Sequence, residues 1–214
     1  MMSAKVCRIT NYKDALLSIE NGAKALGFIF FPGSKRFIHE NHAKKIIDDL
    51  PSSIFKVGVF VNQPKDQINK INSFLNLNAI QLHGDEDANF CSNFDCFVIK
   101  AIRVANIMNF KLLKSYKVDA FLFDTFWKNS YGGTGKVFNW KLLKGFSGPS
   151  IILSGGLNHD NIEKAINCVK PQAVDVNSGI ELYPGKKDKK KIELFFSKLK
   201  NINEEYYGKD LFDV

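Results

Sequence analysis

A thiol and a carboxylate stand at the ends of two apolar segments that lie far apart in the chain. Cys7 ends the segment Lys5–Cys7, and Asp124 directly follows the apolar run Ala120–Phe123. A thiolate can accept a proton and a carboxylic acid can donate one, so a fold that brings the two groups together would create an acid–base pair. We expect Lys5 or Arg8 to lower the pKa of the thiol. No metal-binding or cofactor motif accompanies the pair, so we expect neither a metal nor a cofactor.

Two glycine-containing segments are candidate phosphate-binding loops. They are Ser154-Gly155-Gly156-Leu157 and Asn177-Ser178-Gly179, and each follows an apolar run. Glycine exposes backbone N–H groups, and a short helix after the second segment would direct its positive end toward an anion. The residues assigned to phosphate binding are Gly155, Gly156, Asn177, Ser178 and Gly179.

Further polar side chains are candidates for substrate binding. Arg36 is one of only three arginines in a lysine-rich chain, and its planar fork suits an anionic group. His83 either polarises a substrate or has a structural role. Asp175 lies inside the apolar run Ala173–Val176, where it binds a substrate hydroxyl or organises buried hydrogen bonds. The full set of candidate substrate-binding residues is Lys5, Arg8, Arg36, His83 and Asp175.

The glycine-rich segment Tyr131–Lys136 has some likeness to a nucleotide-phosphate loop. It does not fit that motif, because Ser130 stands where the first glycine is required and Val137 follows the lysine. We expect a flexible lid over the mouth of the site instead, formed by Gly132, Gly133, Thr134 and Gly135.

Short, almost continuously apolar runs recur along the chain and alternate with amphipathic patterns. The runs are Lys5–Ile9, Ala25–Phe30, Phe55–Phe60, Ala79–Leu82, Phe97–Ala101, Ala120–Phe123, Ile151–Ser154 and Ala173–Val176. The helical patterns are Tyr12–Asn21, Glu40–Leu50, Pro64–Leu75, Ala105–Tyr116, Asn161–Lys170 and Lys189–Leu199. Such βα units predict a single-domain α/β fold, a TIM (β/α)8 barrel over residues 1–200, with 201–214 as a mobile or surface-docked tail. A doubly wound open sheet is the alternative.

The charge and composition of the chain limit the kinds of partner that it is expected to bind. The 214-residue chain carries a net charge of +8, which favours an anionic partner. A nucleic-acid motif is absent from the sequence, and we interpret the lysines of 186–191 as a solvated helix start. No apolar segment is long enough for a membrane span or a signal peptide, and the four cysteines form no CxxC pair, so we expect a cytoplasmic protein.

Taken together, these segments resemble phosphoribosylanthranilate isomerases, over about residues 3–200. The matching motifs are Lys5–Ile9, Ala25–Phe30, Ser34–Arg36, Val57–Asn62, Gln81–Asp85, Gly132–Lys136, Leu153–Leu157, Val174–Gly179 and Pro184–Asp188. The family's opening motif is Lys-hydrophobe-Cys-Gly-Ile, and this chain has Arg8 in place of the glycine. The arginine adds bulk and charge at the mouth, so it either clashes with the substrate's aromatic ring or contacts an anionic group.

The resemblance implies an Amadori rearrangement of N-(5-phosphoribosyl)anthranilate to 1-(2-carboxyphenylamino)-1-deoxyribulose 5-phosphate, a step of tryptophan biosynthesis. It implies that Asp124 is the general acid, that Cys7 is the general base, and that Arg36 holds the anthranilate carboxylate. The partner is then a small anionic phosphosugar, with no nucleic acid or membrane, and the chain is a monomer or homodimer. The alternatives are another phosphosugar isomerase of the same fold and a non-catalytic phosphosugar-binding barrel.

Overall fold

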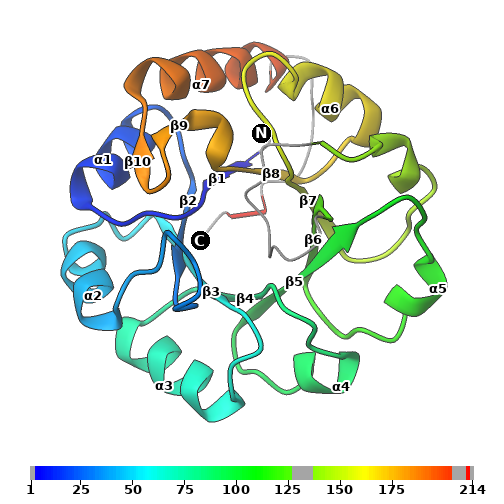
Figure 1. The fold of residues 1–214 in the computed structure, drawn as a ribbon, viewed down its shortest axis with the longest axis horizontal. Helices are drawn as coiled ribbons and strands as arrows, with labels where there is room; N and C mark the ends of the chain where they lie inside the picture. The colour runs from blue at the N-terminus through cyan, green and yellow to red at the C-terminus, as the bar shows by residue number, and fades with distance from the viewer. Residues whose placement is uncertain (1–2, 127–136, 204–210, 213–214) are drawn as a thin grey trace.

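Eight parallel strands close into a barrel in the computed structural model, which describes residues 3–126, 137–203 and 211–212. The strands are β1 (Ser3–Val6), β2 (Ala25–Ile29), β3 (Phe55–Phe60), β4 (Ala79–Leu82), β5 (Phe97–Val104), β6 (Ala120–Thr125), β7 (Ser150–Leu153) and β8 (Ala173–Val176). They pair in sequence order, and β8 closes against β1 with Asp175 beside Lys5. The predicted TIM barrel is confirmed, and Figure 1 shows helices around it.

The helices differ widely in length. They are α1 (Tyr12–Glu20), α2 (Glu40–Asp48), α3 (Lys65–Leu75), α4 (Ala88–Cys91), α5 (Phe110–Leu113), α6 (Ile162–Val169) and α7 (Lys189–Asn203), with 3-10 helices η1 (Trp140–Leu143) and η2 (Ser178–Ile180). A small hairpin, β9 (Glu181–Tyr183) and β10 (Lys186–Lys187), lies between η2 and α7.

Two predicted elements are shorter than expected. The helix predicted over 105–116 is reduced to α5. Asn109 caps it, and Ile107 is 84% exposed, so burial of that side chain does not favour a longer helix. The first strand ends at Val6 and not at Ile9, because Arg8 has a left-handed φ of 67°, which an extended strand cannot contain. Cys7 therefore lies just after β1.

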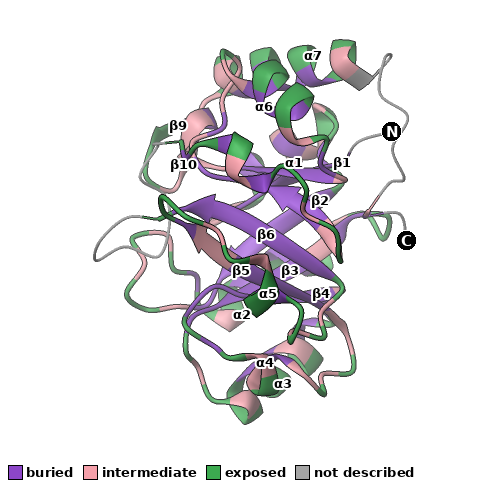
Figure 2. Cartoon of the chain, turned by 90° about the vertical axis from the view of Figure 1, so that its right-hand side faces the viewer, coloured by how far each residue is buried: buried purple, intermediate pink, exposed green. Residues whose placement is uncertain are grey.

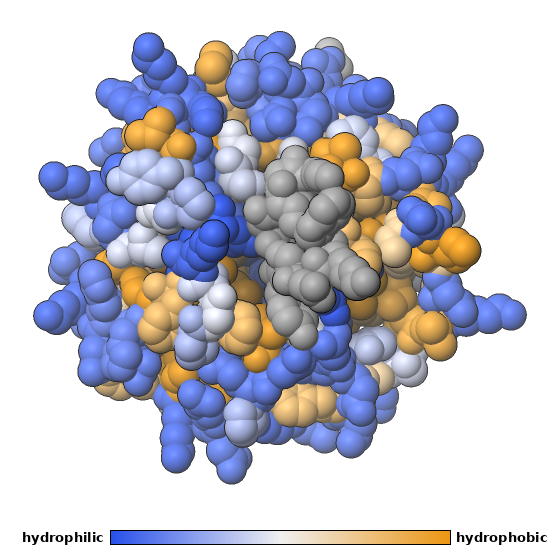
Figure 3. Space-filling model, viewed as in Figure 1, coloured by the Kyte–Doolittle hydropathy of each residue, from blue (hydrophilic) through white to orange (hydrophobic). Residues whose placement is uncertain are grey.

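Side chains alternate between the inside of the barrel and the surrounding helices, as the period of a strand requires. Val57, Ile99, Leu122 and Ile152 belong to an apolar layer inside the barrel, and a larger cluster fills the space between barrel and helices. The barrel strands are almost entirely buried in Figure 2. Polar side chains are gathered toward the carboxyl ends of the strands, and strongly hydrophilic residues lie near the centre of that face in Figure 3.

The C-terminal residues depart from the prediction of a separate tail after residue 200. Helix α7 continues to Asn203. Phe212 is buried in the apolar layer inside the barrel, with its ring centroid 5.3 Å from that of Phe55. Phe55 begins β3, so Phe212 closes the end of the barrel opposite the polar face. Within the described residues, no helix has the length and apolar character needed to cross a membrane.

Candidate active site

A cavity of about 590 Å³ opens at the carboxyl ends of the barrel strands. Most of the predicted site residues line it: Cys7, Arg8, Arg36, His83, Asp124, Gly155, Gly156, Asp175, Asn177 and Ser178. Loops and strand ends far apart in sequence are thus brought to one place, as is usual for this end of a parallel barrel. Lys5 and Gly179 are not in the lining. The predicted lid of Gly132, Gly133, Thr134 and Gly135 lies outside the described residues.

Cys7 lines the cavity and is closely packed there. Its backbone N–H donates to the carbonyl of Val176 (3.1 Å), and a Cβ placed on Gly27 of β2 would come within 2.7 Å of its Sγ. Burial raises the pKa of the Cys7 thiol, and the charges of Lys5 and Arg8 only partly offset it. Lys5 and Arg8 each lower the pKa of the thiol, as predicted, but removal from water outweighs them and the net pKa is raised. The unliganded protein holds Cys7 as a thiol.

Lys5 and Asp175 form an ion pair inside the barrel, with Nζ and Oδ1 2.8 Å apart. Burial lowers the pKa of Lys5, but the neighbouring Asp175 and Cys7 reverse this and leave it raised. Asp175 also accepts a hydrogen bond from the Ser154 hydroxyl (3.4 Å). Lys5 is fully buried and is not among the lining residues, so its contact with substrate stays a prediction. Asp175 both pairs with Lys5 and lines the cavity.

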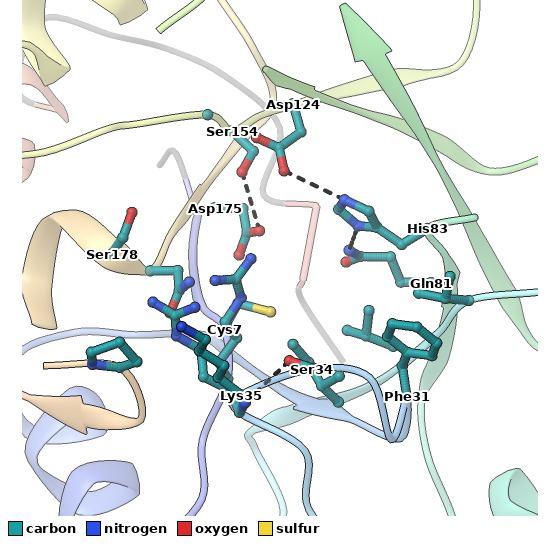
Figure 4. A pocket seen from close by; sticks show the side chains of 18 of the residues that line it. Cys7, Phe31, Ser34, Lys35, Gln81, His83, Asp124, Ser154, Asp175 and Ser178 are labelled. Carbon is teal, nitrogen blue, oxygen red and sulfur yellow. Dashed lines mark hydrogen bonds and ion pairs between the residues drawn. The ribbon is translucent and has the colours of Figure 1, made fainter. Parts of the chain in front are cut away.

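Asp124 and His83 face each other on another side of the cavity from Cys7 (Figure 4). Nε2 of His83 lies 3.4 Å from Oδ2 of Asp124, and the other carboxylate oxygen accepts the backbone N–H of Thr125 (2.7 Å). Burial raises the pKa of Asp124, but His83, the Arg8 charge and the Thr125 N–H outweigh it, so the pKa lies below its usual range. The carboxyl group is ionised in the unliganded protein.

The two glycine-containing loops meet at one edge of the cavity. Gly155 and Gly156 have left-handed φ angles of 86° and 66°, which favour glycine. A Cβ on Gly179 would come within 1.9 Å of the Leu157 carbonyl, so this glycine lets the loop after β8 pack directly on the loop after β7. The predicted short helix is the three-residue η2, which begins at Ser178. Gly179 thus shapes the site without lining it.

Arg36 already holds a carboxylate. Its Nε and Nη2 donate to Glu181, with Nη2 2.5 Å from Oε2. Burial raises the pKa of Glu181, but the contact with Arg36 outweighs it and leaves the pKa lowered. The bidentate ion pair predicted for a substrate carboxylate is therefore made with Glu181. The end-on face of the guanidinium, formed by Nη1 and Nη2, is the part left for another anion.

Lys187 is a site residue that the sequence interpretation missed. Its Nζ donates to the carbonyl of Cys7 (2.8 Å) and to Oδ1 of Asn177 (3.1 Å), so it links the loop after β1 to the loop after β8. Burial lowers its pKa to about 8. The prediction that this lysine belongs to a solvated helix start is wrong, because it is 3% exposed on β10 and α7 begins two residues later. Its place in the motif Pro184–Asp188 was the available signal.

Apolar side chains form one wall of the cavity, and the sequence interpretation did not identify them as site residues. Phe31 follows β2, Val59 is in β3, and Val61 follows β3. Phe31 lies beside the cavity in Figure 4. All three fall in or next to the matching motifs Ala25–Phe30 and Val57–Asn62, which was the only signal for them. Such a wall suits an aromatic ring. Among the described residues, no cluster of three or more His, Cys, Asp or Glu side chains is arranged to hold a metal ion.

The closed barrel and the position of its polar cavity define a (β/α)8-barrel protein with its site at the carboxyl ends of the strands. The chain belongs to the N-(5'-phosphoribosyl)anthranilate isomerase family, whose sequence profile matches residues 4–198. The N-(5'-phosphoribosyl)anthranilate isomerase of Thermotoga petrophila is 43% identical over 206 residues, which cover 94% of this chain and all of that protein.

Solved structures agree with this assignment. One is a phosphoribosyl anthranilate isomerase in complex with reduced 1-(o-carboxyphenylamino)-1-deoxyribulose 5-phosphate, 39% identical with a TM-score of 0.80 over 94% of this chain and all of that one. Another describes monomers generated from the dimeric Thermotoga maritima enzyme, with the same identity, TM-score and coverage.

Proposed function

We propose that this protein isomerises N-(5'-phosphoribosyl)anthranilate to 1-(2-carboxyphenylamino)-1-deoxyribulose 5-phosphate, with Cys7 as general base and Asp124 as general acid. The observation that carries these roles is that both side chains line one cavity together with the two glycine-containing loops. Family membership supports the reaction, and the shared cavity supports the roles proposed for the two residues. The rearrangement is an internal exchange of oxidation state between two carbons, so it needs no redox cofactor.

The reaction divides into two proton transfers. Asp124 donates a proton to the ribose ring oxygen as the C1–O bond breaks, and the nitrogen lone pair forms the Schiff base. Cys7 then removes the proton from C2, the electrons of that C–H bond neutralise the iminium, and the resulting enolamine tautomerises to the ketone. His83 faces the carboxyl group of Asp124 throughout and keeps it oriented.

In the free protein, the directions of the two pKa shifts put a proton on Cys7 and leave Asp124 ionised. The proposed mechanism needs the reverse arrangement. The pKa of Cys7 is raised and that of Asp124 is lowered, so the resting pair is thiol and carboxylate. The productive pair is thiolate and carboxylic acid, which carries the same net charge. One proton must therefore pass from Cys7 to Asp124 before or during substrate binding, and the productive form is the minor one.

Anionic groups at the two ends of the substrate meet different parts of the cavity. We assign the phosphate to the loops that contain Gly155, Gly156 and Ser178, where backbone N–H groups can surround it. The aromatic ring lies against Phe31 and Val59, and its carboxylate faces the end-on side of Arg36. The net charge of +8 supports an anionic partner of this kind. The cytoplasmic location and the monomer or homodimer stay predictions.

The test is a fluorescence assay that follows consumption of N-(5'-phosphoribosyl)anthranilate by the purified protein. We expect C7S and D124N each to lower turnover by about 100-fold or more, as for general acid–base groups. Matched controls are C168S and D160N, which change exposed residues of the same types and should turn over like the wild type. Near wild-type turnover in C7S and D124N would remove the proposed roles. An inactive wild type would favour the non-catalytic alternative.

A further inference from the structure

Arg8 is an arginine at a backbone position suited to glycine. Its φ is 67°, and the sequence motif that it interrupts has glycine there. Its side chain is not turned out to solvent, because the residue is only 8% exposed and lines the cavity. The left-handed backbone is therefore retained with a long cationic side chain folded into the site.

The charge of Arg8 differs from that of three other cations near the cavity; Lys35 also lines the cavity, but it is exposed to solvent. Arg36 is paired with Glu181 and Lys5 with Asp175, and Lys187 lies 3.8 Å from Glu181. The buried Nη1 of Arg8, by contrast, makes no hydrogen bond to any residue that the structure describes. A buried guanidinium nitrogen without a partner costs free energy unless a ligand supplies the acceptor.

We propose that Arg8 binds the carboxylate on the aromatic ring of the substrate, sharing it with the end-on face of Arg36. The inference rests on the proposed function. Arg36 alone is a poor site for this group, because Glu181 neutralises it and would repel a second carboxylate. Arg8 adds a second guanidinium to the same cavity, with a buried Nη1 that has no hydrogen bond to a described residue. It is thus a specificity-determining residue that favours a ring bearing an anionic group.

Two other roles for Arg8 predict different behaviour. A guanidinium that acts only on the pKa values of Cys7 and Asp124 would affect all substrates and analogues alike. A side chain that merely obstructs the ring would weaken every aromatic ligand, and its removal would strengthen binding. Only a contact with the carboxylate makes the effect depend on whether the ligand carries that group.

The experiment measures calorimetric binding of two stable analogues. One is reduced 1-(o-carboxyphenylamino)-1-deoxyribulose 5-phosphate, and the other is the same compound with a phenyl ring that lacks the carboxylate. The variants are R8G, which suits the left-handed backbone, R8N, which tolerates it without a charge, and R8K, which keeps the charge but loses the fork. R103Q is the matched control, because Arg103 is ion-paired with Asp85 outside the cavity.

We expect R8G and R8N to weaken the carboxylated analogue by about 10- to 100-fold, the range for a charge-assisted hydrogen bond. The analogue without the carboxylate should change by less than about threefold, R8K should be intermediate, and R103Q should match the wild type. A loss that is equal for both analogues, or no loss, would overturn the inference and leave the proposed function standing. A wild type that binds neither analogue would instead remove the proposed function, and the inference with it.

Discussion

Nε2 of His83 lies 3.4 Å from a carboxylate oxygen of Asp124, and Nδ1 of the same ring lies 2.8 Å from the amide nitrogen of Gln81. Nδ1 is hydrogen-bonded to Gln81, and Nε2 is the ring nitrogen that faces Asp124. Gln81 is in β4 and Asp124 in β6. Gln81 and His83 from one part of the sequence thus meet Asp124 from another, and this contact orients the proposed acid.

Replacing His83 with alanine should raise the pKa of Asp124. Burial by itself raises that pKa, and contact with His83 is the largest opposing influence. The carboxyl group then gains its proton at a higher pH than in the wild type, so the acidic limb of the profile of kcat/KM against pH should move to higher pH. Steady-state kinetics between about pH 5 and 9 measures this. A lower kcat with an unmoved limb would show that His83 has only a structural role.

Alkylation by iodoacetamide should show that Cys7 is a thiol near neutral pH. Because burial raises its pKa above the ordinary value of 9.0, the thiolate fraction and the rate should keep rising beyond pH 9. Labelling of C91S/C96S/C168S, followed by mass spectrometry, isolates this thiol. Adding K187M should slow labelling further, since the Lys187 charge lowers the pKa of Cys7. A rate that levels off below pH 8 would contradict the assigned direction.

Gly27 should not tolerate a side chain, because it lies directly against the Cys7 thiol. A Cβ at this position would lie 2.7 Å from Sγ of Cys7, so G27A should lower the free energy of unfolding by about 1–3 kcal/mol and displace the proposed base. The double variant C7A/G27A should recover much of that stability, because the atom in conflict is gone. Urea unfolding of the two single variants and the double variant gives the coupling. Additive effects would mean that Gly27 is required for another reason.

The barrel and most of its site were predictable from the sequence, because both follow from local patterns of apolar and polar residues. Buried parallel strands are continuous apolar runs, and the strand-end rule places Cys7, His83 and Asp124 at one mouth. The ion pairs were not predictable. Arg36 meets Glu181 across 145 positions of sequence, and no local pattern records that distance. Within its run of lysines, Lys187 is set apart only by its place in the motif Pro184–Asp188, which does not show that its side chain is buried. The direction of the Cys7 pKa shift depends on burial, which sequence does not give.

Arg8→Gly should stabilise the fold even though it removes a proposed binding residue. A non-glycine residue at a φ of 67° carries a backbone cost of about 1–2 kcal/mol, which glycine avoids. R8G should therefore unfold at a higher urea concentration than the wild type, whereas R8A, which keeps the backbone cost, should gain less. Equal stability of R8G and R8A would show that the backbone conformation is not the source of the gain.

Phe212 should contribute to stability without affecting the reaction. It is buried against Phe55 and the apolar layer inside the barrel, at the end opposite the cavity. F212A should lower the free energy of unfolding by about 3–5 kcal/mol, the usual cost of removing a buried phenylalanine side chain, with kcat unchanged. F74A is the matched control, because Phe74 on α3 is 47% exposed; it should change stability by less than about 0.5 kcal/mol. If F212A were as stable as F74A, the aromatic contact at the base of the barrel would have no energetic role, and a chain ending at Asn203 should then be equally stable. If the contact is important, that truncated chain should lose at least as much stability as F212A does, because it lacks the same buried ring and also Leu211, which packs on the same layer.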